Sequence, residues 1–283
     1  MNISLNGRII KSQDARIPAV QSALYYGTGC FETVRADSGK FLHFVKHCER
    51  LKNGLAWLGA DPDDIPDARM LYDDTGLLLE ANQLQDKIAK VRIQAFPEDS
   101  PGYGKRQSPP VSILITAEPY QPAGQPIRVC TVSTRTIPGI SRPAELKLSN
   151  MLHYRNAYRE AEKQGFDDGL LLNIEGYIAE TSIANIFWRK GDEISTPSAN
   201  CDLLPGIMRS VVIDLVENMD RLILKEGKLL PELLKEADEA WVTNSVKELV
   251  WLKEVDGKRY KTDSEFKKKL QSKFSWFKNE NLS

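Results

Sequence analysis

The sequence predicts an α+β protein of two domains. Its 283 residues exceed one average domain and are short for three, so the length fits two packed domains or one large domain, and we take two. The composition, 41% hydrophobic and 27% charged, is that of a soluble globular protein with a large core. Residues 118–126, EPYQPAGQP, hold three prolines and one glycine between two strand-like segments, which indicates a connection between domains. We therefore expect an N-terminal α+β domain over residues 1–120 and a C-terminal domain over residues 121–283.

The first domain is expected to open with a hairpin. The segment NISLNGRII forms two strands around Asn6-Gly7, because Asn-Gly readily adopts the positive φ angles of a tight turn. Residues 41–58 predict a strand and then a helix with leucines at helical spacing, at positions 51, 55 and 58. Residues 81–90 favour a continued helix. The segments 90–96 (KVRIQAF) and 111–118 (VSILITAE) predict strands.

The second domain mixes the same two patterns. Residues 127–134 (IRVCTVST) predict a strand, and residues 148–165 predict an amphipathic helix that ends at Gly165. The segments 169–173 and 177–188 are expected to form a hairpin around Glu175-Gly176. After Pro205-Gly206, residues 207–219 predict another helix.

The charge balance argues against several classes of partner. With 38 Lys+Arg against 39 Asp+Glu, the net charge of -1 creates no global field for nucleic acid or an anionic membrane. The one dense basic run, from Lys267 to Lys269, is interpreted as a solvated helix face. No segment has the pattern of a secretion signal or the length of a membrane span, so we expect a cytoplasmic protein.

Cysteine and histidine usage favours neither disulfides nor a metal site. The four cysteines are scattered without a C-x-x-C pair, which fits a reducing compartment. The three histidines form no ligand motif at zinc spacing, so we expect no bound metal. Cys30 is interpreted as a small packed thiol, because no histidine and acid are arranged around it in the sequence as a nucleophile requires.

Lys147 and Glu180 together suit an aldehyde cofactor. Taken alone, Lys147 would be interpreted as a surface lysine, and Glu180 as a strand-end carboxylate in water. A lysine that attacks an aldehyde must be neutral often enough to be nucleophilic, which burial and nearby cations achieve. A carboxylate at a pyridine nitrogen keeps that nitrogen protonated, so that the ring accepts the electrons left when an α-proton departs. Ser182 and Asn185 follow Glu180 in an otherwise apolar run.

A phosphate dianion would need local donors, because the chain has no spare positive charge. Arg50 offers a guanidinium, although by itself it would be a surface charge on its helix. Ile207 and Met208 open a helix, so their amides are unpaired donors at the positive end of its dipole. Asn244 and Ser245 follow a strand-like segment and offer side-chain donors and amides. Most such helix starts and turns are simply capped structure.

Six segments of the chain resemble the class IV pyridoxal-phosphate enzymes, and they occur in the same order and at about the same spacing as in that family. This family includes branched-chain aminotransferases, D-amino acid aminotransferases and 4-amino-4-deoxychorismate lyases. The segments are YYGTGCFETVR (25–35), HCERL (47–51), LKLSN (146–150), GFDDGLLLNIEGYIAETSIANIFW (165–188), TPSANCDLLPGIMR (196–209) and VTNS (242–245). The resemblance covers nearly the whole chain. It implies the two-domain fold type IV, similar to D-amino acid aminotransferase, with a smaller N-terminal α/β lobe and a larger C-terminal lobe resembling an α/β barrel.

The same resemblance implies a cofactor, an assembly and residue roles. The cofactor is pyridoxal 5'-phosphate, and the assembly is a homodimer. Matching positions make Lys147 the Schiff-base lysine, which also moves the proton during catalysis, and Glu180 the partner of the pyridine nitrogen. The phosphate is expected to bind to the other matching positions, which are Arg50, Ile207, Met208 and Ser245. Asn244, next to Ser245, is a further cofactor-binding candidate from the residues alone.

The motifs leave the reaction open between transamination and lyase chemistry. Residues 181–197 followed by LLPGIMR look most like the lyases. Phe96-Pro97, however, stands where lyases and D-amino acid aminotransferases often carry an arginine-glycine pair, and Met151 stands where branched-chain enzymes carry a tyrosine. We expect an amino-acid aminotransferase that passes the amino group to a 2-oxo acid. The alternatives are an aminodeoxychorismate lyase, which releases pyruvate, and a cofactor-binding protein without turnover.

The substrate carboxylate is expected to bind near Arg92, which lies where branched-chain enzymes place an arginine of the substrate pocket. A guanidinium can bind a carboxylate through two parallel hydrogen bonds. Tyr26 and the loop with Tyr103, Lys105 and Arg106 are the further candidates. The alternative for Arg92 is a strand arginine that points to solvent.

Overall fold

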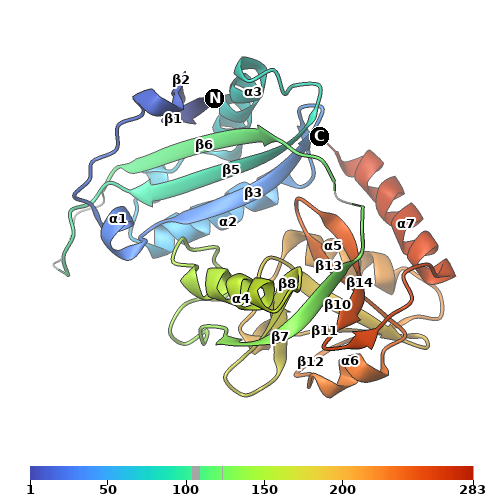
Figure 1. Cartoon of the computed structure of the whole chain (residues 1–283). Helices are drawn as coiled ribbons and strands as arrows, with labels where there is room; N and C mark the ends of the chain where they lie inside the picture. The colour runs from blue at the N-terminus through green and yellow to red at the C-terminus, as the bar shows by residue number, and fades with distance from the viewer. Residues whose placement is uncertain (104–108, 123, 283) are drawn as a thin grey trace. The chain divides into compact units, whose positions relative to one another are not determined.

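The computed structural model describes residues 1–103, 109–122 and 124–282 (Figure 1). The chain forms two compact units, and each contains helices and strands, so the predicted α+β class is confirmed. Unit 1 comprises Met1–Gln121, Leu146–Asn150 and Asn281–Ser283, and unit 2 comprises Pro122–Glu145 and Met151–Glu280. The chain therefore returns briefly to unit 1 at residues 146–150. The domain limits 1–120 and 121–283 stay a prediction.

Unit 1 is built on an antiparallel sheet of six strands in the order β2-β1-β6-β5-β3-β4 (Figure 1). The strands are β1 (Asn2–Leu5), β2 (Arg8–Lys11), β3 (Cys30–Asp37), β4 (Lys40–Phe41), β5 (Ile88–Pro97) and β6 (Val111–Pro119). Asn6 and Gly7 have φ values of 51° and 75°, which confirms the predicted hairpin turn. The short elements of this unit are η1 (Ser12–Asp14), α1 (Ser22–Tyr26) and η2 (Pro62–Asp64).

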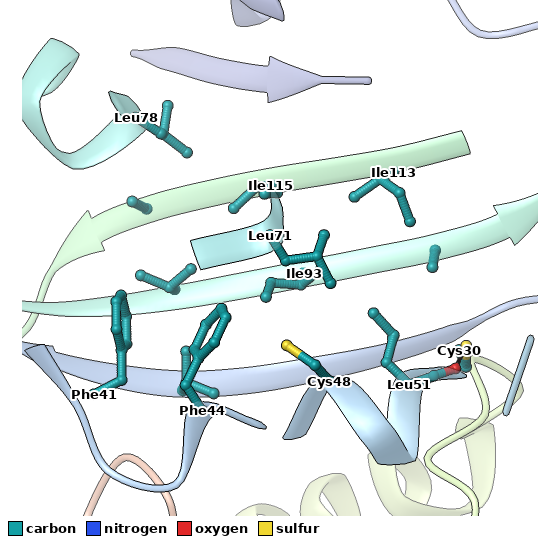
Figure 2. Packing of buried hydrophobic residues seen from close by; sticks show 14 of the residues in the cluster. Cys30, Phe41, Phe44, Cys48, Leu51, Leu71, Leu78, Ile93, Ile113 and Ile115 are labelled. Carbon is teal, nitrogen blue, oxygen red and sulfur yellow. Dashed lines mark hydrogen bonds between the residues drawn. The ribbon is translucent and has the colours of Figure 1, made fainter. Parts of the chain in front are cut away.

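Two helices, α2 (Phe44–Trp57) and α3 (Ala68–Ala81), form the core of unit 1 with one face of its sheet. Figure 2 shows Cys48 and Leu51 of α2 pointing toward Ile93 of β5. The helix expected over residues 81–90 is wrong. The chain turns at Gln83, where φ is 58°, and enters β5 at Ile88, because the alternating apolar residues that follow fill the sheet face below the helices.

Unit 2 is built on a nine-stranded mixed sheet in the order β12-β11-β10-β13-β14-β7-β8-β9, with β15 paired to β14. The parallel pairs are β11 with β12, β14 with β7 and β7 with β8. The strands are β7 (Ile127–Arg135), β8 (Asp168–Leu172), β9 (Ile178–Thr181), β10 (Asn185–Lys190), β11 (Glu193–Pro197), β12 (Ile223–Gly227), β13 (Glu239–Asn244), β14 (Glu248–Val255) and β15 (Lys258–Arg259). The hairpin around Glu175-Gly176 is confirmed as β8 and β9. The second strand, expected over residues 177–188, is divided into β9 and β10. The Thr181 amide donates to the carbonyl of Ala184 and closes a turn between them.

The main helices of unit 2 are α4 (Leu152–Lys163), α5 (Ile207–Glu217) and α7 (Glu265–Asn281), with the short helices η3 (Ala199–Cys201) and α6 (Glu232–Glu236). The predicted helix after Gly206 is confirmed as α5. The predicted helix over 148–165 begins only at Leu152, because Leu148 is held in a β-bridge to Cys30. Gly169 permits the close approach of α4 to the sheet, since a Cβ there would lie 2.7 Å from the carbonyl oxygen of Ala157. Within the described ranges, no helix is long and apolar enough to cross a membrane.

Candidate active site

Lys147 lies on a short segment that unit 1 holds against the start of β3. The Phe31 amide donates to the carbonyl of Lys147 at 2.9 Å, and the Ser149 amide donates to the carbonyl of Gly29 at 2.8 Å. The bridge between Cys30 and Leu148 lies between these two bonds. The backbone of the predicted cofactor lysine is therefore fixed on the edge of a strand that lies more than a hundred residues earlier in the sequence.

The side chain of Lys147 lies at an aromatic ring that it shares with Arg92. Its Nζ is 4.9 Å from the centroid of the Phe31 ring, and Cζ of Arg92 is 3.7 Å from the same centroid. Arg92 is half-buried, and burial lowers the pKa of its guanidinium. Its Nη2 donates to Oε1 of Gln94 at 2.8 Å, while Nε2 of Gln94 donates to Oγ of Ser149 at 2.7 Å. Unit 1 thus brings the predicted substrate arginine close to the predicted cofactor lysine.

Strand alternation explains why these residues meet. Phe31 pairs with Gln94 across β3 and β5, and successive side chains of a strand point to opposite faces. Phe31, Arg92 and Gln94 therefore occupy the sheet face that α2 and α3 leave uncovered. Glu32, the residue after Phe31, points to the helix side.

Arg50, the predicted phosphate arginine, is paired with Glu32 on that helix side. Its Nε donates to Oε1 of Glu32 at 2.6 Å and its Nη2 donates to Oε2 at 2.8 Å, while Nδ1 of His47 lies 2.7 Å from Oε2. Glu32 is 1% exposed. Burial raises the pKa of Glu32, but the hydrogen bonds from Arg50 and His47 outweigh burial and lower this pKa to about 2. Burial is also the main cause of the lowered pKa of His47.

The sequence reading missed Glu32 and His47. The available signal was the spacing of His47 and Arg50, three residues apart on one helix face, after an acidic residue in an apolar strand. Glu32, itself in contact with His47, orients the Arg50 guanidinium, so Arg50 is not a mobile surface charge.

Glu180, the predicted partner of the cofactor ring, is a buried carboxylate of unit 2. It is 4% exposed, and it accepts hydrogen bonds from the Tyr154 hydroxyl at 2.5 Å, the Leu204 amide at 2.8 Å and Nδ2 of Asn185 at 3.2 Å. A buried carboxylate is costly unless donors surround it, and donors to its charged form favour that form. The geometry suits a group that remains an anion. Tyr154 was missed from sequence, where it was read only as a residue of the amphipathic helix.

Asn185 connects Glu180 to the start of α5. Its Nδ2 also donates to the carbonyl of Leu204 at 2.8 Å, and its Oδ1 accepts from the Gly206 amide at 3.2 Å. A Cβ on Gly206 would lie 2.2 Å from Oδ1 of Asn185, so a larger residue here would force the Asn185 side chain to shift. Ile207 and Met208 then open α5, where first-turn amides have no acceptor within the helix. Asn185 thereby brings together, within unit 2, the Glu180 carboxylate and the α5 amides that are predicted to bind an anion.

The turn at the end of β13 lies beside Asn185. Thr243 pairs with Asn185 across β13 and β10. Asn244 joins this turn to the segment between β9 and β10: its Nδ2 donates to the carbonyl of Ile183 at 3.1 Å, and its Oδ1 accepts from the Val246 amide of its own turn at 3.0 Å. Ser245, the next residue, is half-buried. The roles predicted for Asn244 and Ser245 in phosphate binding stay predictions.

The remaining candidates lie on the surface of unit 1 or outside the described residues. Tyr26 is 47% exposed, Tyr103 is 97% exposed, and their rings stack at 5.9 Å. Lys105 and Arg106 lie outside the described residues. Cys30 is 1% exposed, its Sγ contacts the carbonyl oxygen of Leu51 at 3.5 Å, and burial raises the pKa of its thiol. These features agree with a packed thiol rather than a nucleophile.

Comparison with known proteins identifies the family. The family described as "Amino-transferase class IV" matches residues 29–255. A "Putative branched-chain-amino-acid aminotransferase" of Methanocaldococcus jannaschii is 32% identical over 97% of this chain and 95% of its own. The aminodeoxychorismate lyase of Bacillus subtilis is 31% identical over 93% of this chain and 89% of its own. The solved branched-chain aminotransferase from Thermoproteus uzoniensis with norvaline has a TM-score of 0.88 and 26% identity, covering 97% of this chain and 93% of that chain.

The fold is that of a fold type IV enzyme, and the chain belongs to the class IV aminotransferase family. It is a pyridoxal-phosphate-dependent enzyme. The residues present fit this cofactor. In unit 2, Glu180 is a buried carboxylate that would face the ring nitrogen, and the first-turn amides of α5, which have no acceptor within the helix, would bind the phosphate. In unit 1, Lys147 would supply the amine, beside the Phe31 ring.

Proposed function

We propose that the enzyme transfers the amino group of an apolar amino acid to a 2-oxo acid. One observation carries this proposal: the amine of Lys147 and the guanidinium of Arg92 lie at the same Phe31 ring. Arg92 offers two donors for an α-carboxylate, and Phe31 offers an apolar surface for a side chain without charge. Similarity to several proteins named branched-chain aminotransferases supports the same substrate class.

Each candidate site residue has a defined task in this proposal. Lys147 holds the cofactor through its amine and afterwards carries the proton from the α-carbon of the amino acid. Bound pyridoxal phosphate supplies an electron sink for the charge that develops at this carbon. Glu180 holds the proton on the ring nitrogen through its carboxylate. Arg50 and the amides of Ile207 and Met208 bind the phosphate.

A panel of amino donors tests the proposal. The protein is loaded with pyridoxal phosphate, and borohydride is expected to link the cofactor covalently to Lys147, as peptide mass analysis would show. L- and D-amino acids are then added without an acceptor, and the loss of the visible absorbance of the cofactor is followed. We expect aliphatic donors to react faster than charged donors by about tenfold or more, since one methylene in an apolar pocket contributes about 1–3 kcal/mol to discrimination. Equal rates for aspartate and leucine would contradict the apolar site.

Aminodeoxychorismate lyase activity is the second candidate function. The observation that favours it is the 31% identity to the Bacillus subtilis lyase over most of both chains. Pyruvate release from aminodeoxychorismate, without a 2-oxo acid acceptor, would select this activity. A protein that binds the cofactor but shows no spectral change with any donor would instead be a binding protein without turnover.

The homodimer and the cytoplasmic location belong to the same proposal. The homodimer is implied by the resemblance to the family, and the location stays an expectation. Sedimentation of the loaded enzyme is expected to give twice the chain mass of 31.9 kDa. A fully active enzyme that sediments with the mass of one chain would contradict the dimer.

A further inference from the structure

The hydroxyl of Tyr154 donates a hydrogen bond to Oε1 of Glu180, the carboxylate predicted to face the cofactor ring. Tyr154 lies in the first turns of α4, and its ring is 8% exposed. The helix turns Tyr154 inward on the same buried face as Ala157, and this orientation brings its hydroxyl to Glu180.

The surroundings of Tyr154 keep its hydroxyl protonated and pointed at Glu180. Burial, followed by the negative charge of Glu180, raises its pKa well above the usual value, so the hydroxyl remains a donor at every working pH. The His153 ring packs against it with a centroid distance of 4.0 Å. Glu180 is therefore the acceptor that this donor meets at Oε1.

We propose that Tyr154 is a positioning residue that holds the Glu180 carboxylate ionised and aimed, so that the shared proton stays on the ring nitrogen of the cofactor. The inference rests on the proposed function, because it takes Glu180 as the partner of that nitrogen. The new element is Tyr154, whose hydroxyl donates to Glu180 and lowers the affinity of this carboxylate for a proton. Tyr154 itself touches neither substrate nor reacting atoms in this assignment.

The physical argument concerns where one proton resides. Between a carboxylate and a pyridine nitrogen, the proton lies with the more basic partner. A donor to the carboxylate stabilises its charged form and makes it less basic. Removing the Tyr154 hydroxyl takes away the hydrogen bond to Oε1 of Glu180, so the carboxylate becomes more basic and draws the proton away from the ring.

The test uses Tyr154→Phe, with Tyr158→Phe as the matched control. Tyr158 lies on the same helix one turn later and is 42% exposed. Each enzyme is loaded with pyridoxal phosphate labelled with ¹⁵N in the ring, and the ¹⁵N chemical shift of the bound cofactor is measured. We expect the protonated value for the wild type and for Tyr158→Phe, and a shift toward the unprotonated value for Tyr154→Phe. An unchanged shift in Tyr154→Phe would overturn the inference.

Kinetics provide a second readout. A lost hydrogen bond to a charged group is expected to lower kcat for the preferred amino donor by about 10-fold to 100-fold, with a much smaller change in KM. A rise in KM alone, with kcat unchanged, would contradict the assignment. If Tyr154→Phe does not fold, Tyr154→Met removes the same donor with a side chain that fills irregular space, and the same ¹⁵N measurement applies.

The two proposals fail in different ways. A wild-type enzyme that binds the labelled cofactor but converts no amino donor would contradict the proposed function, while the ¹⁵N shift would still decide the role of Tyr154. A wild type whose bound ring nitrogen is already unprotonated would overturn the role assigned here, whatever the donor panel shows.

Discussion

At the scale of single residues, two buried carboxylates, one in each unit, bear on the candidate site, and both are surrounded by donors. Glu32 is held by Arg50 and His47, and Glu180 by Tyr154, Asn185 and the Leu204 amide. The desolvation cost of a buried charge is large, so each carboxylate depends on its donors. The two carboxylates differ in purpose, since Glu32 orients an arginine whereas Glu180 is proposed to face the cofactor ring.

Glu32 is expected to make the stability of the enzyme sensitive to acid. Its folded-state pKa of about 2 lies below the ordinary value of 4.5, so its stabilising contribution is present above pH 4.5 and is lost as pH falls toward 2. Urea unfolding of the wild type and Glu32→Gln between pH 7 and 3 measures this. We expect the wild type to be the more stable protein near neutral pH, with the difference shrinking below about pH 4.5. A difference that does not depend on pH would mean that the glutamate contributes through packing alone.

Arg92 is expected to act on substrate binding. Replacing it with glutamine removes the guanidinium at Phe31, and a lost charged hydrogen bond corresponds to a rise in KM for the amino donor of roughly 10-fold or more. Steady-state kinetics measure this change. Lys90→Gln is the matched control, because Lys90 lies two residues earlier on the same strand face and pairs with Glu118. Similar kinetics for Arg92→Gln and the wild type would return Arg92 to a structural role.

At the scale of elements, the starts of β3 and α5 position the candidate site. The segment 146–150 adds to the start of β3 through backbone hydrogen bonds, so Lys147 depends on the strand rather than on a flexible loop. The start of α5 is tied to β10 by the side chain of Asn185. In both places a rigid element supports a group that must be held in a fixed position.

Gly206→Ala is expected to disturb the start of α5. The added Cβ would lie 2.2 Å from Oδ1 of Asn185, a buried side chain that cannot move without losing its own bonds. We expect a loss of about 1–3 kcal/mol in the free energy of unfolding and weaker cofactor binding, measured by denaturant titration and by cofactor absorbance. Gly76→Ala is the control, because Gly76 lies within α3 with open space around it and is expected to gain up to about 1 kcal/mol. Equal stability of the two variants would show that Asn185 yields easily.

At the scale of the whole molecule, the groups assigned to the cofactor are divided between the two units. Lys147, Arg50 and Arg92 belong to unit 1, whereas Glu180 and the start of α5 belong to unit 2. A ligand that binds the folded chain and not the unfolded chain stabilises the fold by mass action. The enzyme should therefore be most stable when it is loaded.

Adding pyridoxal phosphate is expected to raise the unfolding temperature. At a free concentration 100 times the dissociation constant, the stabilisation should be about 2.7 kcal/mol. Scanning calorimetry at several cofactor concentrations measures it. The increase should become smaller in Glu180→Gln, which keeps the size of the side chain and removes its charge. The same increase in both proteins would mean that Glu180 contributes nothing to cofactor binding.

Local patterns in the sequence determined much of the secondary structure. The Asn6-Gly7 hairpin, the helix after Gly206 and the strand at residues 90–96 follow from turn chemistry and from the spacing of apolar residues, which act over a few neighbours. The order of motifs also determined the family and the cofactor, because it needed no knowledge of distance. The helix expected over residues 81–90 failed because the sheet, rather than local propensity, decides where β5 begins.

Only the tertiary structure decided the partners of the functional groups. Strand alternation and pairing placed Arg92 and Lys147 at one ring, α4 carried the Tyr154 hydroxyl to Glu180, and α2 brought Arg50 to Glu32. Each of these contacts joins residues that are distant in sequence. Hydrogen bonds depend on separations of about 3 Å, and such separations between distant residues arise only when the chain has folded.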